Sequence, residues 1–226
     1  MIARFPQKFI FFLLLVILSI ELHAADWPSY GGDNGSRKYA ALDQIGAQNV
    51  ARLSTAWTWD SVDNDQVAEN RRQENFRATP GGYKATPIVI DGTMYIPTSF
   101  GSIAALDART GEEKWVFETG AWEAGTPANL GYNTRGVAYW QRGEFTRIFF
   151  ATNDSYLWSI DAESGQPDSR FGEGGRVDLA QGLGREINRR QYGVVSPPLV
   201  SNDIVIVNSI VNDLPQTKEM PPGHVR

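Results

Sequence analysis

The fold is decided by the stretch Ala105-Leu106-Asp107-Ala108-Arg109-Thr110-Gly111-Glu112-Glu113-Lys114-Trp115. It joins the end of an apolar strand, a tight turn and a second strand that reaches a tryptophan. The residues before it, 86–96, are rich in β-branched and apolar side chains and break at Asp91-Gly92, the strongest two-residue signal for a β-hairpin. Residues 86–117 are therefore predicted to form consecutive antiparallel strands.

This pattern returns along the chain. Residues 148–165 contain a second copy, in which Asp161 lies 54 positions after Asp107. A third copy begins at Ser196-Pro197-Pro198-Leu199-Val200. Units of roughly 40–50 residues with several short strands each are typical of the blades of a β-propeller, and we expect an all-β fold of this kind. The alternative is a β-sandwich of three unrelated hairpins; Trp115 argues against it, although the second copy has no tryptophan at the matching place.

The first 25 residues are predicted to be a signal peptide. Arg4 and Lys8 form a basic start, residues 9–20 form an apolar run, and the segment ends in small residues at Ala24 and Ala25. The apolar run is shorter than the ~20 residues that span a bilayer comfortably. We expect cleavage after one of the two alanines and export of residues 26–226, with an uncleaved anchor as the alternative.

The composition excludes several kinds of site. The chain contains no cysteine, so it has no disulfide, no thiolate metal ligand and no covalently attached haem. It contains two histidines: His23 lies in the predicted signal peptide and His224 lies near the end of the sequence. A Ser-His-Asp triad or a multi-histidine zinc site is therefore not expected. The net charge of −5 gives no support to a nucleic-acid partner.

Several stretches resemble the quinoprotein dehydrogenases, enzymes that carry pyrroloquinoline quinone (PQQ) on an eight-bladed β-propeller whose blades are locked by tryptophan turns. These stretches are the Trp115 turn, residues 26–32, 53–59 and 134–139, and the region from Ser196-Pro197-Pro198 to 221–226. The resemblance covers nearly all of residues 26–226.

The resemblance implies a partial β-propeller, that is, about three of the first blades with tryptophan-docking turns, and an amino-terminal fragment of a longer protein. The layout is closer to the glucose and polyol dehydrogenases than to the methanol dehydrogenases. In the methanol branch an adjacent cysteine pair lies near the quinone, and Asn129-Leu130 stands at that place here.

The resemblance also implies positions for cofactor and metal ligands. Arg135 takes the place of an arginine near the quinone, where a guanidinium can bind cofactor carboxylates through paired charge-assisted hydrogen bonds. Lys84 stands where many relatives have an acidic residue; it can pair with a cofactor carboxylate, and the alternative is that it points to solvent. Ser209 is a further cofactor candidate. Asp213, with Asn212 beside it, is the candidate ligand for Ca²⁺, which prefers carboxylate oxygen, and a lanthanide is the alternative metal.

For a complete protein, the resemblance implies oxidation of a sugar, polyol or alcohol hydroxyl, with hydride transfer to PQQ and electrons passed on to ubiquinone or a cytochrome. The catalytic base would lie beyond Arg226, so we expect no catalytic residue in this chain and no turnover by the chain alone. The expected location is the periplasm, with attachment to the inner membrane as an option. A non-catalytic periplasmic propeller scaffold and a carbohydrate-binding module with exposed tryptophans remain alternatives.

Overall fold

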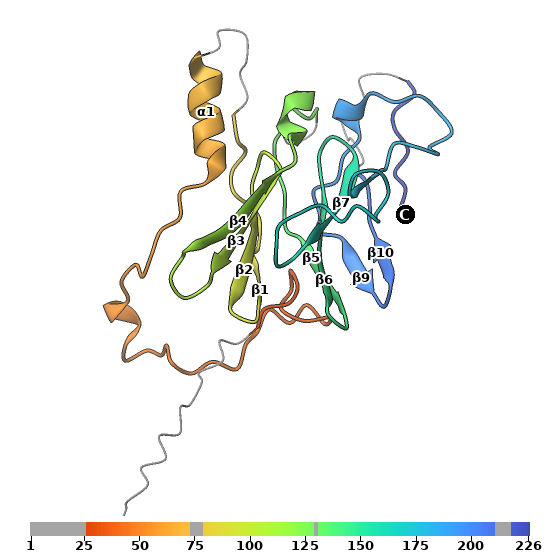
Figure 1. Ribbon diagram of the computed structural model, residues 1–226. Helices are drawn as coiled ribbons and strands as arrows, with labels where there is room; N and C mark the ends of the chain where they lie inside the picture. Colours follow the sequence, from red (N-terminus) through yellow and green to blue (C-terminus); the bar gives the residue numbers. More distant parts are fainter. Residues whose placement is uncertain (1–25, 73–78, 129–130, 211–217) are drawn as a thin grey trace, which may run out of the picture.

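The computed structural model describes residues 26–72, 79–128, 131–210 and 218–226, with the side chains of 70–72 left out. It contains two four-stranded antiparallel sheets and one two-stranded sheet, which lie next to one another in chain order (Figure 1). The all-β fold class expected from the sequence is confirmed.

The first sheet is a simple meander. Its strands are β1 (Ile88–Ile90), β2 (Thr93–Pro97), β3 (Ser102–Asp107) and β4 (Glu113–Glu118), each paired with the next. Asp91 and Gly92 connect β1 to β2, and both have positive φ angles, 47° and 72°, as a tight type I′ hairpin requires. The strand order therefore follows directly from the turn residues that the sequence displays.

The second sheet repeats the first. Its strands are β5 (Ala138–Arg142), β6 (Phe145–Ala151), β7 (Tyr156–Asp161) and β8 (Arg176–Asp178). The two-stranded sheet consists of β9 (Leu199–Ser201) and β10 (Ile204–Ile206). The third strand of each complete sheet ends at the turn aspartate, Asp107 or Asp161, so the spacing of 54 residues is the spacing of two equivalent sheets.

The sheets are arranged radially. Each begins at a common line, because the segments that precede β1, β5 and β9 are bonded to one another through Arg135: the Thr86 amide donates to the Arg135 carbonyl at 2.9 Å, and the Arg135 amide donates to the Val195 carbonyl at 2.8 Å. The fourth strands lie farthest from this line in strand order. First strands at the centre and last strands outside are the arrangement of propeller blades, not of unrelated hairpins in a sandwich.

Each complete sheet has a turn on which a tryptophan from the preceding part of the chain docks. Trp115, in the outer strand β4, lies on the turn after β7: its Nε1 donates to the Ala162 carbonyl at 3.1 Å, and a Cβ atom at Gly165 would lie 2.6 Å from the indole ring. Trp57 lies in the same way on the turn after β3, where a Cβ atom at Gly111 would lie 2.5 Å from the ring. The predicted tryptophan-docking turn thus occurs twice.

The second and third sheets are joined differently. In the first sheet, Trp115 pairs with Ala105 of β3. The equivalent position in the second sheet is opposite Ser159 of β7 and is occupied by Gly175, whose carbonyl accepts the Ser159 amide at 2.9 Å. Instead, Trp140 of β5 donates from Nε1 to the Asn202 carbonyl at 3.0 Å, in the turn between β9 and β10. The missing outer tryptophan, noted in the sequence, is therefore a real difference between the two interfaces.

The hydrophobic core lies mainly between neighbouring sheets. Buried side chains of β1, β2 and β3 pack against those of β6 and β7, and a second cluster lies between the second sheet and the segments around β9 and β10. The residues completely covered in the first cluster include Ile88, Ile103, Ile148 and Ile160.

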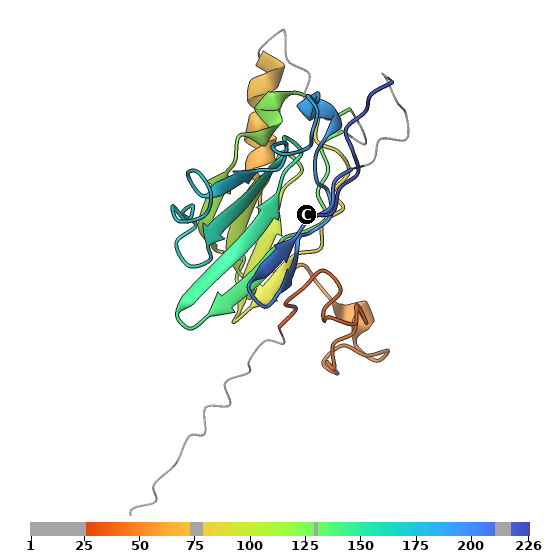
Figure 2. The ribbon, with the colours of Figure 1, turned by 90° about the vertical axis from the view of Figure 1, so that its right-hand side faces the viewer.

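One α-helix, α1 (Val62–Arg72), and three short 3₁₀ helices interrupt the strands: η1 (Val50–Arg52), η2 (Ala121–Ala124) and η3 (Arg189–Gln191). The helix α1 and the segment 26–53 lie at opposite ends of the sheets in both views (Figures 1 and 2). Among the described residues, no helix has the length and apolarity that a membrane span requires.

Candidate functional site

The centre of the radial arrangement is built from four chain segments, residues 80–87, 132–137, 193–198 and 208–210, which we call the hub. Hydrogen bonds between main-chain groups connect them. Besides the two bonds of Arg135, the Gly81 amide donates to the Tyr132 carbonyl at 3.0 Å and the Ile210 amide donates to the Gly193 carbonyl at 2.8 Å. Segments that are far apart in sequence therefore lie side by side at the centre.

Two of the predicted cofactor ligands lie on adjoining hub segments. Arg135 and Lys84 both have exposed side chains, and among the described residues neither side chain has a hydrogen-bond or ion-pair partner. Lys84 lies two residues before Thr86, whose amide is bonded to Arg135. The fold thus places two cationic residues on adjoining main-chain segments at the central line.

Ser209, the third candidate, lies on the last hub segment, on the far side of residues 193–198. Its hydroxyl is 3.3 Å from the His224 carbonyl and accepts the His224 amide at 3.1 Å. The hydroxyl therefore connects two parts of the chain, and a cofactor would have to share it with His224.

The predicted metal ligands, Asp213 and Asn212, lie outside the described residues. Within the ranges that the structure describes, no group of three or more His, Cys, Asp or Glu side chains is placed to hold a metal ion. The metal site thus stays a prediction from the sequence.

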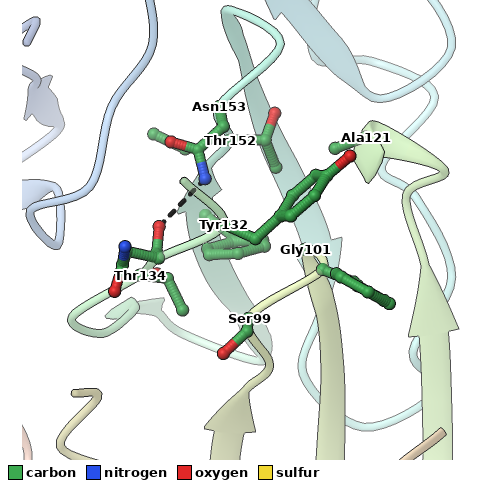
Figure 3. A pocket seen from close by; sticks show the side chains of 11 residues that line it. Ser99, Gly101, Ala121, Tyr132, Thr134, Thr152 and Asn153 are labelled. Carbon is green, nitrogen blue, oxygen red and sulfur yellow. Dashed lines mark hydrogen bonds between the residues drawn. The ribbon is translucent and has the colours of Figure 1, made fainter. Parts of the chain in front are cut away.

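A small cavity of about 10 Å³ lies behind the hub and is lined by residues of 99–101, 132–134 and 150–153, together with Ala121 (Figure 3). Asn153 reaches across it, and its Nδ2 donates to the Asn133 carbonyl at 2.9 Å, the dashed line in Figure 3. Asn153 also lies against the hub at a second point, because a Cβ atom at Gly193 would lie 2.7 Å from the Asn153 carbonyl oxygen. Sequence reasoning missed this residue, since a lone asparagine in a turn carries no distinctive signal.

Charged groups near the turn between β6 and β7 are connected by hydrogen bonds and an ion pair. Burial raises the pKa of Asp154, while its carboxylate accepts a hydrogen bond from the Thr152 hydroxyl. Arg189 donates to the Asp154 carbonyl at 3.3 Å and forms an ion pair with Asp178. Arg189 is thus bonded both to the turn between β6 and β7 and to β8.

A larger hollow, of about 440 Å³, lies on the face of the first sheet that is turned away from the second sheet. Its walls are mostly apolar and include Trp57, Trp59 and Tyr83. Asp63, at the start of α1, also lines it; this residue is 5% exposed, its carboxylate accepts the Phe100 amide at 3.0 Å, and burial raises its pKa.

Comparison with known proteins places this geometry in a family. The chain is 28% identical over 221 residues to quinoprotein glucose dehydrogenase A of Acinetobacter calcoaceticus, an alignment that covers 89% of this chain and 26% of the relative. It is 32% identical over 150 residues to the dehydrogenase subunit of a quinone-dependent alcohol dehydrogenase of Gluconobacter oxydans, which covers 64% of this chain and 16% of that one. The chain therefore spans about a quarter of the length of the curated relatives it matches, or less.

Comparison with solved structures supports the same family and fold. The quinohemoprotein alcohol dehydrogenase of Comamonas testosteroni superposes with a TM-score of 0.62 at 27% sequence identity, over 82% of this chain and 23% of that chain. A europium-containing methanol dehydrogenase, at 22% identity and a TM-score of 0.59, supports the same fold. The family model that matches residues 27–226 is the β-propeller domain of glucose, ethanol and alcohol dehydrogenases that use PQQ. With this match over nearly the whole described region, the radial sheets and their tryptophan turns, the chain belongs to the PQQ-dependent glucose/ethanol/alcohol dehydrogenase β-propeller family.

Proposed function

We propose that this chain contributes part of a PQQ site to a quinoprotein dehydrogenase that oxidises a sugar, polyol or alcohol hydroxyl. The observation that carries the proposal is a pair of cations on adjoining segments of the hub, Arg135 and Lys84, whose side chains have no partner within the described part of the chain. Relatives of this chain are named as quinoprotein glucose dehydrogenases and quinone-dependent alcohol dehydrogenases, which supports the substrate class.

The donor chemistry of the hub fits PQQ, which carries several carboxylates. The Arg135 guanidinium can hold one carboxylate through two parallel hydrogen bonds, and Lys84 supplies a point charge for another. When bound, the quinone supplies the hydride acceptor. The residues of this chain would bind and orient it, and Asp213 with Asn212 would offer oxygen ligands to Ca²⁺ or a lanthanide ion.

We further propose that the catalytic base, the substrate pocket and the contact with ubiquinone or a cytochrome are supplied by parts of a complete protein outside residues 26–226. Residues 1–25 would direct export to the periplasm. Intact mass spectrometry of the mature protein, together with cell fractionation, tests the export proposal: cytoplasmic protein that still begins at Met1 contradicts it.

Titration of the purified chain with PQQ, followed by quenching of tryptophan fluorescence, tests the cofactor site. Arg135→Met is expected to weaken binding about tenfold and Lys84→Met by less, because a bidentate contact to a charged group contributes more than a single point charge. Arg52→Met is the matched control, since Arg52 is exposed and lies far from the hub in sequence. Equal affinity for the Arg135→Met variant, the control and the unaltered chain would refute the assignment.

A further inference from the structure

The position of Arg135 depends on its main chain. Its side chain has no partner among the described residues, so only the backbone fixes where the guanidinium begins. That backbone is held from two sides: by Thr86, which donates to its carbonyl, and by Val195, which accepts from its amide. A group that keeps the segments 132–137 and 193–198 in register therefore also sets the place of Arg135.

Asn153 contacts both of these segments. It belongs to the turn between β6 and β7, and its Nδ2 donates at 2.9 Å to the carbonyl of Asn133, two residues before Arg135. Its main chain lies directly under Gly193, two residues before Val195, where even a Cβ atom would collide with it. One turn thus contacts both of the segments whose mutual hydrogen bond holds Arg135.

The chemistry requires a donor at this place. The Asn133 carbonyl can only accept, so the group that faces it must carry a hydrogen. The other half of the same amide, Oδ1, is buried and has no hydrogen-bond partner in the ranges that the structure describes. The contact to Asn133 is consequently what fixes the orientation of the side chain, and a carboxylate of the same shape would place an acceptor against an acceptor.

We infer that Asn153 is a positioning residue for Arg135, acting through the register of the hub and not by touching a ligand. This inference rests on the proposed PQQ site as far as cofactor affinity is concerned. Its structural part, the bracing of the Arg135 amide, is independent of any ligand.

The test compares Asn153→Asp with Asn153→Ala, with Asn34→Asp as a control at an exposed asparagine. At pH 8 the new carboxylate repels the Asn133 carbonyl, so Asn153→Asp is expected to bind PQQ about three- to tenfold more weakly than the unaltered chain. At pH 5 affinity is expected to recover in part, because burial beside the Asn133 carbonyl raises the pKa of the new carboxyl and its protonated form can donate. Asn153→Ala is expected to be weakened equally at both pH values.

The alanine variant also corrects for the other charged groups around the turn, namely Asp154, Arg189 and Asp178, which remain unchanged in it. Amide hydrogen exchange of residues 132–137 is the ligand-free readout: at pH 8 the Arg135 amide is expected to exchange faster in both Asn153 variants than in the control, with the sheets still protected. If the Arg135 amide exchanges at an unchanged rate in the alanine variant, the inference is overturned. This outcome is decisive even if the aspartate variant does not fold. If exchange rises but PQQ affinity does not respond to Arg135→Met, the bracing stands and the cofactor assignment fails.

Discussion

At the scale of single residues, the interface between the sheets depends on two glycines. Gly111 and Gly165 have φ angles of 74° and 70°, and each carries an indole ring on the side where a Cβ atom would stand. The turn aspartates complete the geometry, because the Asp107 carboxylate accepts the Arg109 and Thr110 amides and Asp161 accepts the Ser164 amide. Each turn is thus both a chain reversal and a docking surface.

We expect Gly165→Ala to destabilise the protein by about 2–4 kcal/mol, because the substitution combines an unfavourable φ with a clash against Trp115. Gly143→Ala is the matched control: φ is 60°, yet no atom lies within 4 Å of the added carbon. Chemical denaturation of both variants separates the two effects. Equal losses of unfolding free energy would show that Trp115 does not press on the turn.

Asp63 should make stability depend on pH. Its pKa is raised in the folded state by burial, so the folded protein holds this proton more tightly, and stability is lost as the pH rises from the pKa of the unfolded chain through the folded value. Asp63→Asn keeps an oxygen acceptor for the Phe100 amide and removes the charge. We expect this variant to lose less stability between pH 4 and neutral pH; an unaltered pH profile in urea titrations would contradict the assignment.

Much at the residue scale could be predicted from the sequence, and some of it could not. The Asp-x-x-Thr-Gly turn and Trp115 are local patterns with known geometry. The docking of Trp57 on Gly111 joins residues 54 positions apart, and Asn153 acts through a contact to Asn133. Such contacts depend on the assembled sheets, so no window of sequence contains them.

At the scale of elements, the second sheet contains a buried charged cluster. Arg147 of β6 is 6% exposed; its Nε lies 2.8 Å from the Asp168 carboxylate and its Nη1 lies 2.8 Å from that of Asp161. Although burial opposes ionisation of Asp161 and Asp168, hydrogen bonds from Ser164 and Arg147 lower the pKa of each carboxyl. The cluster fastens the long β7–β8 connection to the sheet.

Arg147→Met should therefore leave two poorly compensated carboxylates and reduce stability by about 2–3 kcal/mol. Because the folded pKa values of Asp161 and Asp168 are lowered, the stability they contribute is present above the unfolded pKa and disappears as the pH falls through the folded values. The acid-unfolding midpoint, followed by circular dichroism, is expected to move to higher pH in the variant. Arg170→Met is the control, because Arg170 is exposed and forms an ion pair with the same Asp168; it is expected to have little effect on the midpoint. If Arg147→Met unfolds at the same pH as the unaltered chain, the proposed role of the cluster is refuted.

The strands could be predicted from sequence because their apolar alternation and turn residues agree. The helix α1 could not: its sequence, Val62 to Arg72, is almost entirely polar and has no apolar stripe. It is held by single contacts, such as the Asp63 carboxylate on the Phe100 amide and Gln66 on Glu118.

At the scale of the whole molecule, stability should decline from the centre of each complete sheet outwards. The strands β2, β3, β6 and β7 are paired on both sides, whereas β9 and β10 pair only with each other among the described strands. The hub candidates Lys84, Arg135 and Ser209 came from family resemblance, and the fold places them on neighbouring segments. Their mutual arrangement was beyond sequence reasoning because it depends on the angle between sheets.

Amide hydrogen exchange at neutral pH is expected to show the slowest exchange in β3 and β6, and exchange at least tenfold faster in β9 and β10. The reason is that an amide paired within a doubly flanked strand opens only with the sheet. The internal reference is residues 54–59, which form no regular strand pairing in the structure and should exchange faster than β3. Uniform protection across all three sheets would contradict this order.

Trp57 has a consequence for circular closure. It stands on the turn of the first sheet as Trp115, an outer-strand residue, stands on the turn of the second. Residues 54–59 consequently occupy the rim position of a sheet that would come before the first one around the axis. In a closed ring of this repeat, the three inner strands of that sheet would come from the last part of the ring and pair with residues 54–59, so that the first and last sheets would be joined by main-chain hydrogen bonds.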